Sequence, residues 1–135
     1  MGRTTNCIIF LSVLLLVSGV TCLMAASSAR AATDVFTIEN VQVDVTADSA
    51  SKAQATAFVQ AQQAAFRQLS EQLLSEAELE KLAPPDINII APLIKDFEVT
   101  EESFSSVRYV GVYTFRFNAA DVRNYFSRLG VTYTD

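Results

Sequence analysis

A serine and a lysine stand at the spacing of a known catalytic motif. Ser49 and Lys52 match S-x-x-K, in which penicillin-binding enzymes place a nucleophilic serine beside a lysine at the start of a helix. The chain contains neither the K-T-G nor the S-D-N that accompanies this motif in those enzymes. Serine at the start of a helix is also the usual N-cap. We therefore interpret Ser49 as a cap.

Two pairs of acidic residues are the other candidates for catalysis. Asp96 and Glu98, or Glu101 and Glu102, would supply the acid and the nucleophile of a glycosidase. Alternate residues of a strand share a face and lie closer than the roughly 5–9.5 Å between such carboxyls, and adjacent residues point to opposite faces. The sequence has no histidine, and its acids form no D-x-D-x-D-G calcium loop, since Asp86-Ile87-Asn88 alone is not one. We therefore expect no catalytic residue, no metal site and no cofactor.

Residues 1–31 have the three parts of a secretory signal peptide. Arg3 precedes an apolar run at 8–24, and small residues then lead to an A-x-A site that ends at Ala31. The pattern predicts export to the periplasm, with cleavage after Ala31. The mature chain would then be residues 32–135, a single α+β domain.

Two alternatives to cleavage stay open. The apolar run is close to the roughly 17–25 residues that span a bilayer, so it would also serve as an uncleaved anchor. Cys22 would otherwise be a lipid attachment site, although Gly19 and Thr21 stand where lipoproteins carry leucine and a small residue.

Removal of residues 1–31 would leave an acidic domain without histidine or cysteine, because Cys7 and Cys22 leave with the signal peptide. Arg3 and Arg30 leave too, so eight basic and fifteen acidic residues remain, with a net charge of −7. Nucleic acids and anionic membrane surfaces need clustered lysine and arginine, so we expect neither as a partner. About a hundred residues suit one domain with one core.

Residues 35–46 predict a strand, because apolar and polar residues alternate along them. The apolar phase switches near Glu39-Asn40, which predicts a bulge there.

Ser49 is a typical cap for the long helix that follows, up to about Ser75. The apolar face of this helix is mostly alanine, which lets a helix lie close to a sheet. That face contains Ala50, Ala57, Phe58, Ala61, Ala65, Leu69 and Leu73.

Short helical turns are predicted between the long helix and the next strand. Ser75 and Glu78 have the spacing of a capping box, S-x-x-E, and the two prolines at 84–85 end this turn. Asp86 or Asn88 would cap a second short helix.

Residues 97–104 and 107–117 predict a hairpin around a two-serine turn. One face of the second strand is aromatic and should pack on the alanine face of the helix. Gly111 leaves a gap in that face, which a close helix would fill. The aromatic residues are Tyr109, Tyr113, Phe115 and Phe117.

The opposite face of this strand is the candidate partner surface, because two valines lie between two arginines. Apolar centres with arginine are typical of protein interfaces. The alternative is that the valines only favour a strand, or that residues 76–96 cover them. The surface consists of Arg108, Val110, Val112 and Arg116.

Asn118 is expected to cap a last helix, and Gly130 is expected to end it in the left-handed conformation. The sequence thus predicts an α+β fold: a three-stranded, mostly antiparallel sheet with the long Ala-rich helix and the C-terminal helix packed on one face. The element order is β-α-(α)-β-β-α. The sequence leaves open which hairpin strand lies beside the first strand.

The order of these elements resembles a proteobacterial family called domain of unknown function 2066. The resemblance rests on the strand VQVDVTADS, the long alanine-rich helix and the strand YVGVYTFRF, which leads to a helix that ends in glycine. It covers residues 35–133. The resemblance implies a signal peptide, and many members continue into a second domain. The role of the family is unknown, so the resemblance implies no catalytic residue.

The function predicted from the sequence is an exported, non-catalytic module that binds an envelope protein or helps to assemble the envelope. Any membrane contact would come through an uncleaved or lipidated N-terminus. One alternative is a carrier of a small apolar ligand between helix and sheet. The other is a hydrolase that uses serine, lysine or carboxylates in place of histidine and cysteine.

Overall fold

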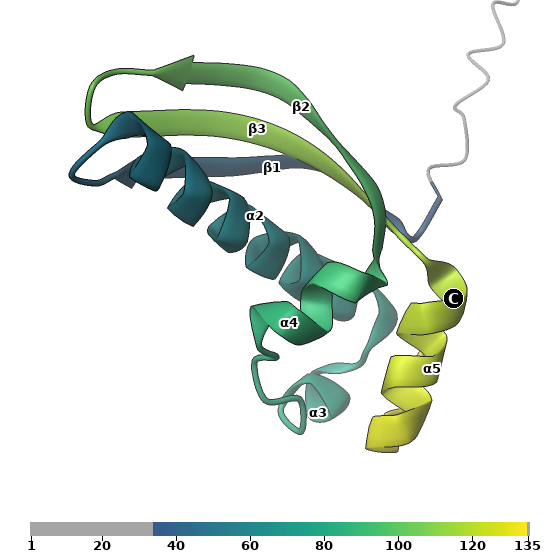
Figure 1. Cartoon of the computed structure of the whole chain (residues 1–135). Helices are drawn as coiled ribbons and strands as arrows, with labels where there is room; N and C mark the ends of the chain where they lie inside the picture. Colours follow the sequence, from purple (N-terminus) through teal and green to yellow (C-terminus); the bar gives the residue numbers. More distant parts are fainter. Residues whose placement is uncertain (1–33, 135) are drawn as a thin grey trace, which may run out of the picture. The chain divides into compact units, whose positions relative to one another are not determined.

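Three strands form one antiparallel sheet, with the last strand of the chain in the middle (Figure 1). The computed structural model describes residues 34–134, so the predicted signal peptide at 1–31 lies outside the described residues. The sheet order is β1-β3-β2, which places the first strand beside the second strand of the hairpin. The strands are β1 (Thr37–Thr46), β2 (Ile94–Phe104) and β3 (Arg108–Phe117).

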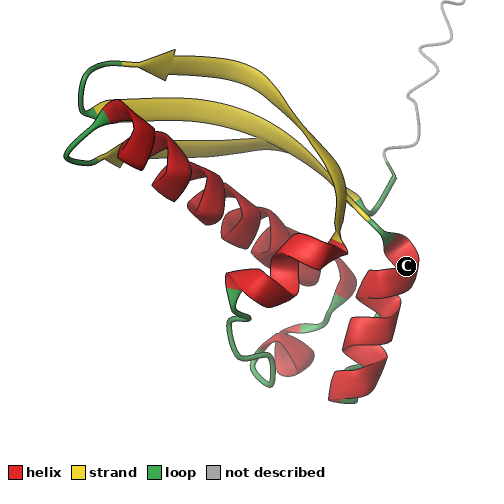
Figure 2. Cartoon of the chain, viewed as in Figure 1, coloured by secondary structure: helices red, strands yellow, loops and turns green. Residues whose placement is uncertain are grey.

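The helices of the described residues lie on one side of this sheet (Figure 2). They are α2 (Ala50–Leu73), α3 (Glu76–Leu79), α4 (Ile87–Ile90), the 3₁₀ turn η1 (Ala91–Leu93) and α5 (Ala119–Leu129). Helix α2 packs mainly on β1 and β3. Helix α5 packs against the second half of α2, where the ring centroids of Phe66 and Phe126 lie 6.2 Å apart. The predicted α+β fold is therefore confirmed.

Strand β1 contains the predicted bulge. Its register with β3 shifts between Ile38 and Val41, and Asn40 adopts a left-handed conformation with φ of 58°. Asparagine is among the few residues other than glycine that adopt this conformation readily. The shift turns both Ile38 and Val41 toward the helix side, where both are buried.

The alanines of α2 bring the helix close to the sheet. Ser49 caps the helix, because its Oγ accepts a hydrogen bond from the backbone N–H of Lys52 at 3.3 Å. Phe66 is also buried, although the 3.6-residue pattern did not place it on the apolar face. The polar residues Gln60, Gln63, Arg67 and Glu71 of the same helix are exposed. The alanines without exposed surface are Ala53, Ala57, Ala61 and Ala65.

Two tyrosine rings fill the gap at Gly111, so the prediction that a helix fills it was wrong. A Cβ at this position would lie 2.8 Å from Cε1 of Tyr109 and 2.9 Å from Cε2 of Tyr113. The aromatic face of β3 does pack on α2, as predicted. The ring of Phe58 in α2 lies 6.0 Å from that of Tyr113 and 6.3 Å from that of Phe115.

The connection between α2 and β2 departs from the prediction in detail. Ser75 makes no side-chain cap hydrogen bond, and Glu78 instead accepts one from the backbone N–H of Thr132. The predicted capping box is therefore wrong. Asp86 is the residue that caps α4, by accepting a hydrogen bond from the backbone N–H of Asn88 at 2.8 Å. Strand β2 starts directly after η1, earlier than the sequence pattern indicated.

Both ends of α5 agree with the prediction. The side chain of Asn118 accepts a hydrogen bond from a backbone N–H of the first turn at 3.1 Å. Gly130 ends the helix with φ of 69°. Val122 and Phe126 are buried, whereas Leu129 is half exposed. Among the described residues, no helix has both the length and the hydropathy that crossing a bilayer requires.

Candidate functional site: a groove beside β2

The S-x-x-K residues make the contacts of a helix start. Ser49 accepts the capping hydrogen bond, and the ammonium of Lys52 binds the carboxylate of Asp48 at 3.0 Å. These contacts agree with the predicted capping role of Ser49.

The acids of β2 take the faces predicted for them. Asp96 and Glu98 share one face, where both bind Arg116. Glu101 and Glu102 lie opposite Val112 and Gly111, on different faces of the sheet. Within residues 34–134, no group of three or more acidic, histidine or cysteine side chains lies in a position to hold a metal ion.

The predicted partner surface lies on the face of the sheet that carries no helix. Arg108, Val110, Val112 and Arg116 alternate with the aromatic residues of β3, so all four share this outer face. Residues 76–96 contain α3 and α4, which lie on the other side of the sheet (Figure 1). The two valines are only partly exposed.

Both arginines of the outer face are paired with carboxylates of the same sheet. Arg108 donates to Asp44 through Nε at 2.8 Å and Nη2 at 2.5 Å. These hydrogen bonds, and the charge of Arg108, lower the pKa of Asp44. Arg116 binds Asp96 and, at 3.3 Å, Glu98. The outer face therefore offers a partner two half-buried valines and little free positive charge.

A more apolar surface lies on the helix side of β2, and we call it the β2 groove. Phe97, Val99 and Phe104 face this side, and their exposed fractions are 48%, 39% and 67%. Together with Val107 they are half of the large apolar side chains that are exposed in the described part of the chain. An opening of about 330 Å³ separates β2 from the first half of α2. It is lined by Ser51, Gln54, Ala55, Phe58, Phe97, Val99, Tyr109 and Tyr113.

The groove is open because α2 lies over the other two strands. Both β1 and β2 are edge strands, but alternate residues of β1 are buried under the helix. In β2, every residue from 97 to 104 is exposed. From α2, Phe58 reaches across, with its ring centroid 4.8 Å from that of Phe97.

A short hydrogen-bond network lies at the floor of the groove. The hydroxyl of Tyr109 donates to Glu102 Oε2 at 3.1 Å and lies 2.9 Å from the hydroxyl of Tyr113. Because Tyr109 has one hydroxyl proton, Tyr113 donates to Tyr109 when that proton points to Glu102. Burial, and then the contact with Tyr113, raise the pKa of Tyr109. Both rings are buried, so the network fixes the floor of the groove.

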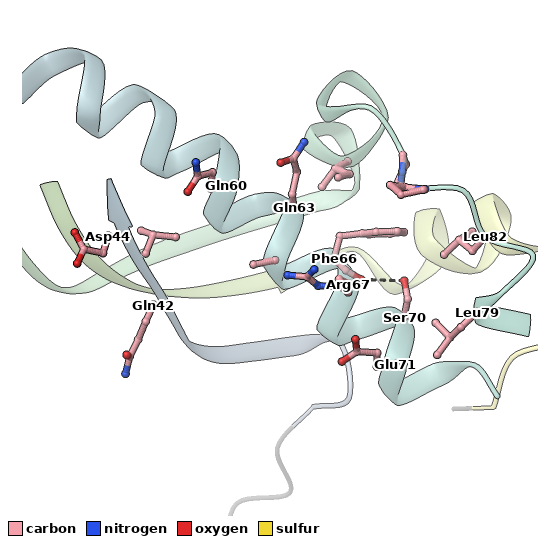
Figure 3. Close-up of a pocket in the computed structure, with 15 residues that line it drawn as sticks. Gln42, Asp44, Gln60, Gln63, Phe66, Arg67, Ser70, Glu71, Leu79 and Leu82 are labelled. Atoms are coloured by element: carbon pink, nitrogen blue, oxygen red, sulfur yellow. Dashed lines mark hydrogen bonds between the residues drawn. The ribbon is translucent and has the colours of Figure 1, made fainter. Parts of the chain in front are cut away.

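A larger cleft of about 720 Å³ lies on the β1 side of α2 (Figure 3). Figure 3 shows that side chains from β1, from α2 and from the segment after α2 surround it. Phe66, Leu79 and Leu82 contribute to its apolar part, and Arg67 contributes a cation. The hydroxyl of Ser70 already donates to the carbonyl of Phe66 at 2.9 Å. This cleft has the size of a small-molecule site but mixed polarity.

The β2 groove was not predicted from the sequence. Phe97 and Val99 stand at odd positions and Phe104 at an even one. In a regular strand they would point to opposite faces, so the sequence predicts no apolar face for this strand. The register of β2 with β3 shifts between Val99 and Glu101, which brings all three apolar residues to one side. The change of phase at Thr100 is the signal in the sequence that indicates this bulge.

No protein-family model, no curated protein and no solved structure matches this chain. The resemblance to domain of unknown function 2066 therefore stays a prediction from the sequence.

Proposed function

We propose that this chain is an exported, non-catalytic module that binds a protein partner through the β2 groove. The observation that supports the proposal is the exposure of Phe97, Val99 and Phe104 along one side of one strand. Single exposed apolar residues are normal on a protein surface, but several on one side of a strand, beside a concave opening, are typical of an interaction site. Aromatic residues are also enriched in protein interfaces.

Export belongs to the proposal because of the signal-peptide pattern at residues 1–31. Mass spectrometry of the protein recovered from the periplasm should give a chain that begins at Ala32. A full-length chain in the membrane fraction, or a lipid on Cys22, would remove periplasmic release from the proposal. The β2 groove does not depend on cleavage of the N-terminus, so partner binding is tested separately.

The binding proposal is tested by affinity capture from envelope extract with two matched variants. The groove variant combines Val99→Thr and Phe104→Thr, which keep the preference for a strand and remove exposed apolar surface. The control variant combines Val110→Thr and Val112→Thr on the outer face. We expect a protein captured by the wild type to be lost with the groove variant and kept with the control variant. Capture that neither variant changes would refute the groove as the binding surface.

A second candidate function, a carrier of a small apolar ligand, is favoured by the cleft of about 720 Å³ beside α2. Ligand sites commonly have volumes of roughly 300–1,000 Å³ and a mostly apolar lining. Native mass spectrometry of the purified protein should then show an added mass that is absent from a Leu82→Arg variant. The absence of an added mass from the wild-type protein would remove this candidate.

A further inference from the structure

We propose that the partner segment adds to the open edge of β2 as an extra strand, and that it alternates apolar with basic residues. This inference rests on the proposed function and specifies how the β2 groove is occupied. The occupant of the groove is an extended peptide segment of a partner protein.

The backbone of β2 is accessible along its whole second half. The strand is at the edge of the sheet, with β3 on one side and no strand of the described residues on the other. Residues 97–104 are all exposed, so this half of the edge strand faces solvent. An edge strand presents unpaired N–H and C=O groups, which an extended peptide can bind with main-chain hydrogen bonds.

The two faces of β2 require different side chains on an added strand. Neighbouring strands place their side chains on the same two faces in register. On the helix side, an added strand would lie next to Val99 and Phe104, with Glu102 between them and bound by the hydroxyl of Tyr109, so apolar residues fit beside the two apolar side chains. On the outer side it would lie next to Glu98 and Glu101, so basic residues fit there. The expected partner segment therefore alternates apolar residues with lysine or arginine.

The charge of β2 supports a basic partner. The strand IKDFEVTEESF contains four acidic residues and one lysine. Asp96 and Glu98 already bind Arg116, and Glu102 accepts from Tyr109. Glu101 has no hydrogen bond and no ion pair among the described residues, so its charge is open to a partner.

The same acids argue against a second copy of this chain as the occupant. If two β2 edges paired, acidic residues of one strand would lie beside acidic residues of the other. Like charges placed directly opposite each other destabilise a strand pair. Charged residues at an edge strand are a common protection against such pairing. The acids of β2 therefore disfavour self-association and leave the edge open to a segment of opposite charge.

The experiment uses three synthetic peptides as probes: one that alternates lysine and valine, one that alternates glutamate and valine, and a lysine–valine peptide N-methylated at every residue, so that neither of its edges can donate. Binding is followed by the amide chemical shifts of the isotope-labelled protein and by their dependence on salt. We expect the lysine–valine peptide to shift the amides of residues 94–104 and to bind less tightly as salt rises. The glutamate–valine peptide should not bind, because its carboxylates would lie beside Glu98 and Glu101. The N-methylated peptide should not bind, because it cannot complete the main-chain ladder.

Two charge-reversal variants make the test specific. Glu101→Lys and Glu39→Lys change the net charge by the same amount, and both replace exposed acids of an edge strand without an ion pair among the described residues. We expect Glu101→Lys to weaken binding of the lysine–valine peptide about five- to tenfold and Glu39→Lys to leave it nearly unchanged. Equal weakening by both variants would show general attraction to an acidic protein and would overturn the proposal.

The outcomes separate this inference from the proposed function. Shifts confined to β1 or to the outer face of β3, or equal binding of the N-methylated peptide, would refute strand addition at β2. So would an absence of shifts at millimolar peptide. If the Val99→Thr and Phe104→Thr variant still loses the captured protein in that case, the β2 groove binds a partner by another mode. If the protein self-associates through β2, the argument from like charge is wrong, and sedimentation of the free protein would show it.

Discussion

The hydroxyl oxygens of Tyr109 and Tyr113 lie 2.9 Å apart because both rings lean over Gly111. Residues two apart on a strand share a face, so the glycine stands between the two tyrosines in one row. Its missing side chain provides the space in which the rings approach each other. The same pair forms the floor of the β2 groove, so one glycine determines both a core contact and the shape of the candidate site.

Gly111→Ala should destabilise the protein through steric overlap. The new Cβ would lie 2.8 Å and 2.9 Å from ring atoms of Tyr109 and Tyr113, and both rings are buried. We expect a loss of about 1–3 kcal/mol in the free energy of unfolding, measured by urea denaturation. Separation of the tyrosines should also alter their near-ultraviolet circular dichroism.

Gly130→Ala is the matched control, because its cost has a different origin. A Cβ at Gly130 would meet no atom within 4 Å, but φ is +69°. We expect a cost of about 1–2 kcal/mol from the left-handed backbone, and Gly130→Asn should recover part of it. The near-ultraviolet signal should not change with either Gly130 variant. A Gly111→Ala protein as stable as the wild type would mean that the rings do not lie over the glycine.

The raised pKa of Tyr109 predicts a loss of stability at alkaline pH. A group whose pKa is higher in the folded state stabilises that state below its unfolded pKa, which is about 10 for tyrosine. The contribution is lost as the pH rises from that value through the higher pKa of the folded protein. Burial is the largest cause, since the ionised phenolate would be poorly solvated under α2.

Tyr109→Phe separates this effect from general alkaline unfolding. The variant should be less stable near pH 8, because it loses the hydrogen bonds to Glu102 and Tyr113. Its stability should fall less than that of the wild type between pH 8 and pH 11, by urea denaturation at each pH. Tyr133→Phe, outside this network, should follow the wild type. Parallel decreases for all three proteins would contradict the assignment to Tyr109.

The position of α2 on the sheet predicts which alanines tolerate a larger side chain. Ala61 and Ala65 have no exposed surface, whereas Gln60 is exposed. Ala61→Leu or Ala65→Leu should overpack the contact with the aromatic face and cost about 1–3 kcal/mol. Gln60→Leu should change the Tm little, because its side chain lies in solvent beside the larger cleft. Equal melting temperatures for the three variants would refute this orientation of the helix.

The sequence predicts the elements well where local patterns and packing agree. The phase change at Glu39-Asn40 indicated the bulge in β1, and the caps at Ser49 and Asn118 marked two helix starts. The strand order did not follow from the pattern, because both hairpin strands offer an edge and only packing selects between them. The central position of β3 agrees with its burial pattern, because its helix-facing residues are buried and its outer residues after Arg108 are at least partly buried.

The candidate site was predictable only in part, for a physical reason. The sequence showed the chemistry of the outer face and offered Asp44 and Glu98 as acids for its arginines, but which acid meets which arginine depends on the strand order. Asp44 reaches Arg108 only because β1 lies beside β3. The β2 groove depends on where α2 stops covering the sheet, and no local pattern in residues 97–104 contains that information.

Substitutions on the outer face of β3 test whether that face or the β2 groove binds the partner. Val110 and Val112 are partly exposed, and the helices lie on the other side of the sheet. Val110→Thr with Val112→Thr should therefore lower the free energy of unfolding by less than about 1 kcal/mol. The methyl groups that are lost are already partly exposed to water, and threonine also favours strands. A larger loss would mean that these valines belong to a packed core.

Partner capture with this double variant then separates the hypotheses. If the β2 groove is the binding surface, the variant should capture the partner as the wild type does. If capture fails while the Tm is unchanged, the surface formed by Arg108, Val110, Val112 and Arg116 binds the partner. The ion pairs favour the first result, because Asp44 neutralises Arg108 and Asp96 neutralises Arg116 within the sheet. A partner that used those arginines would have to displace carboxylates already bound to them, whereas Phe104 and Val99 have no such contact to break.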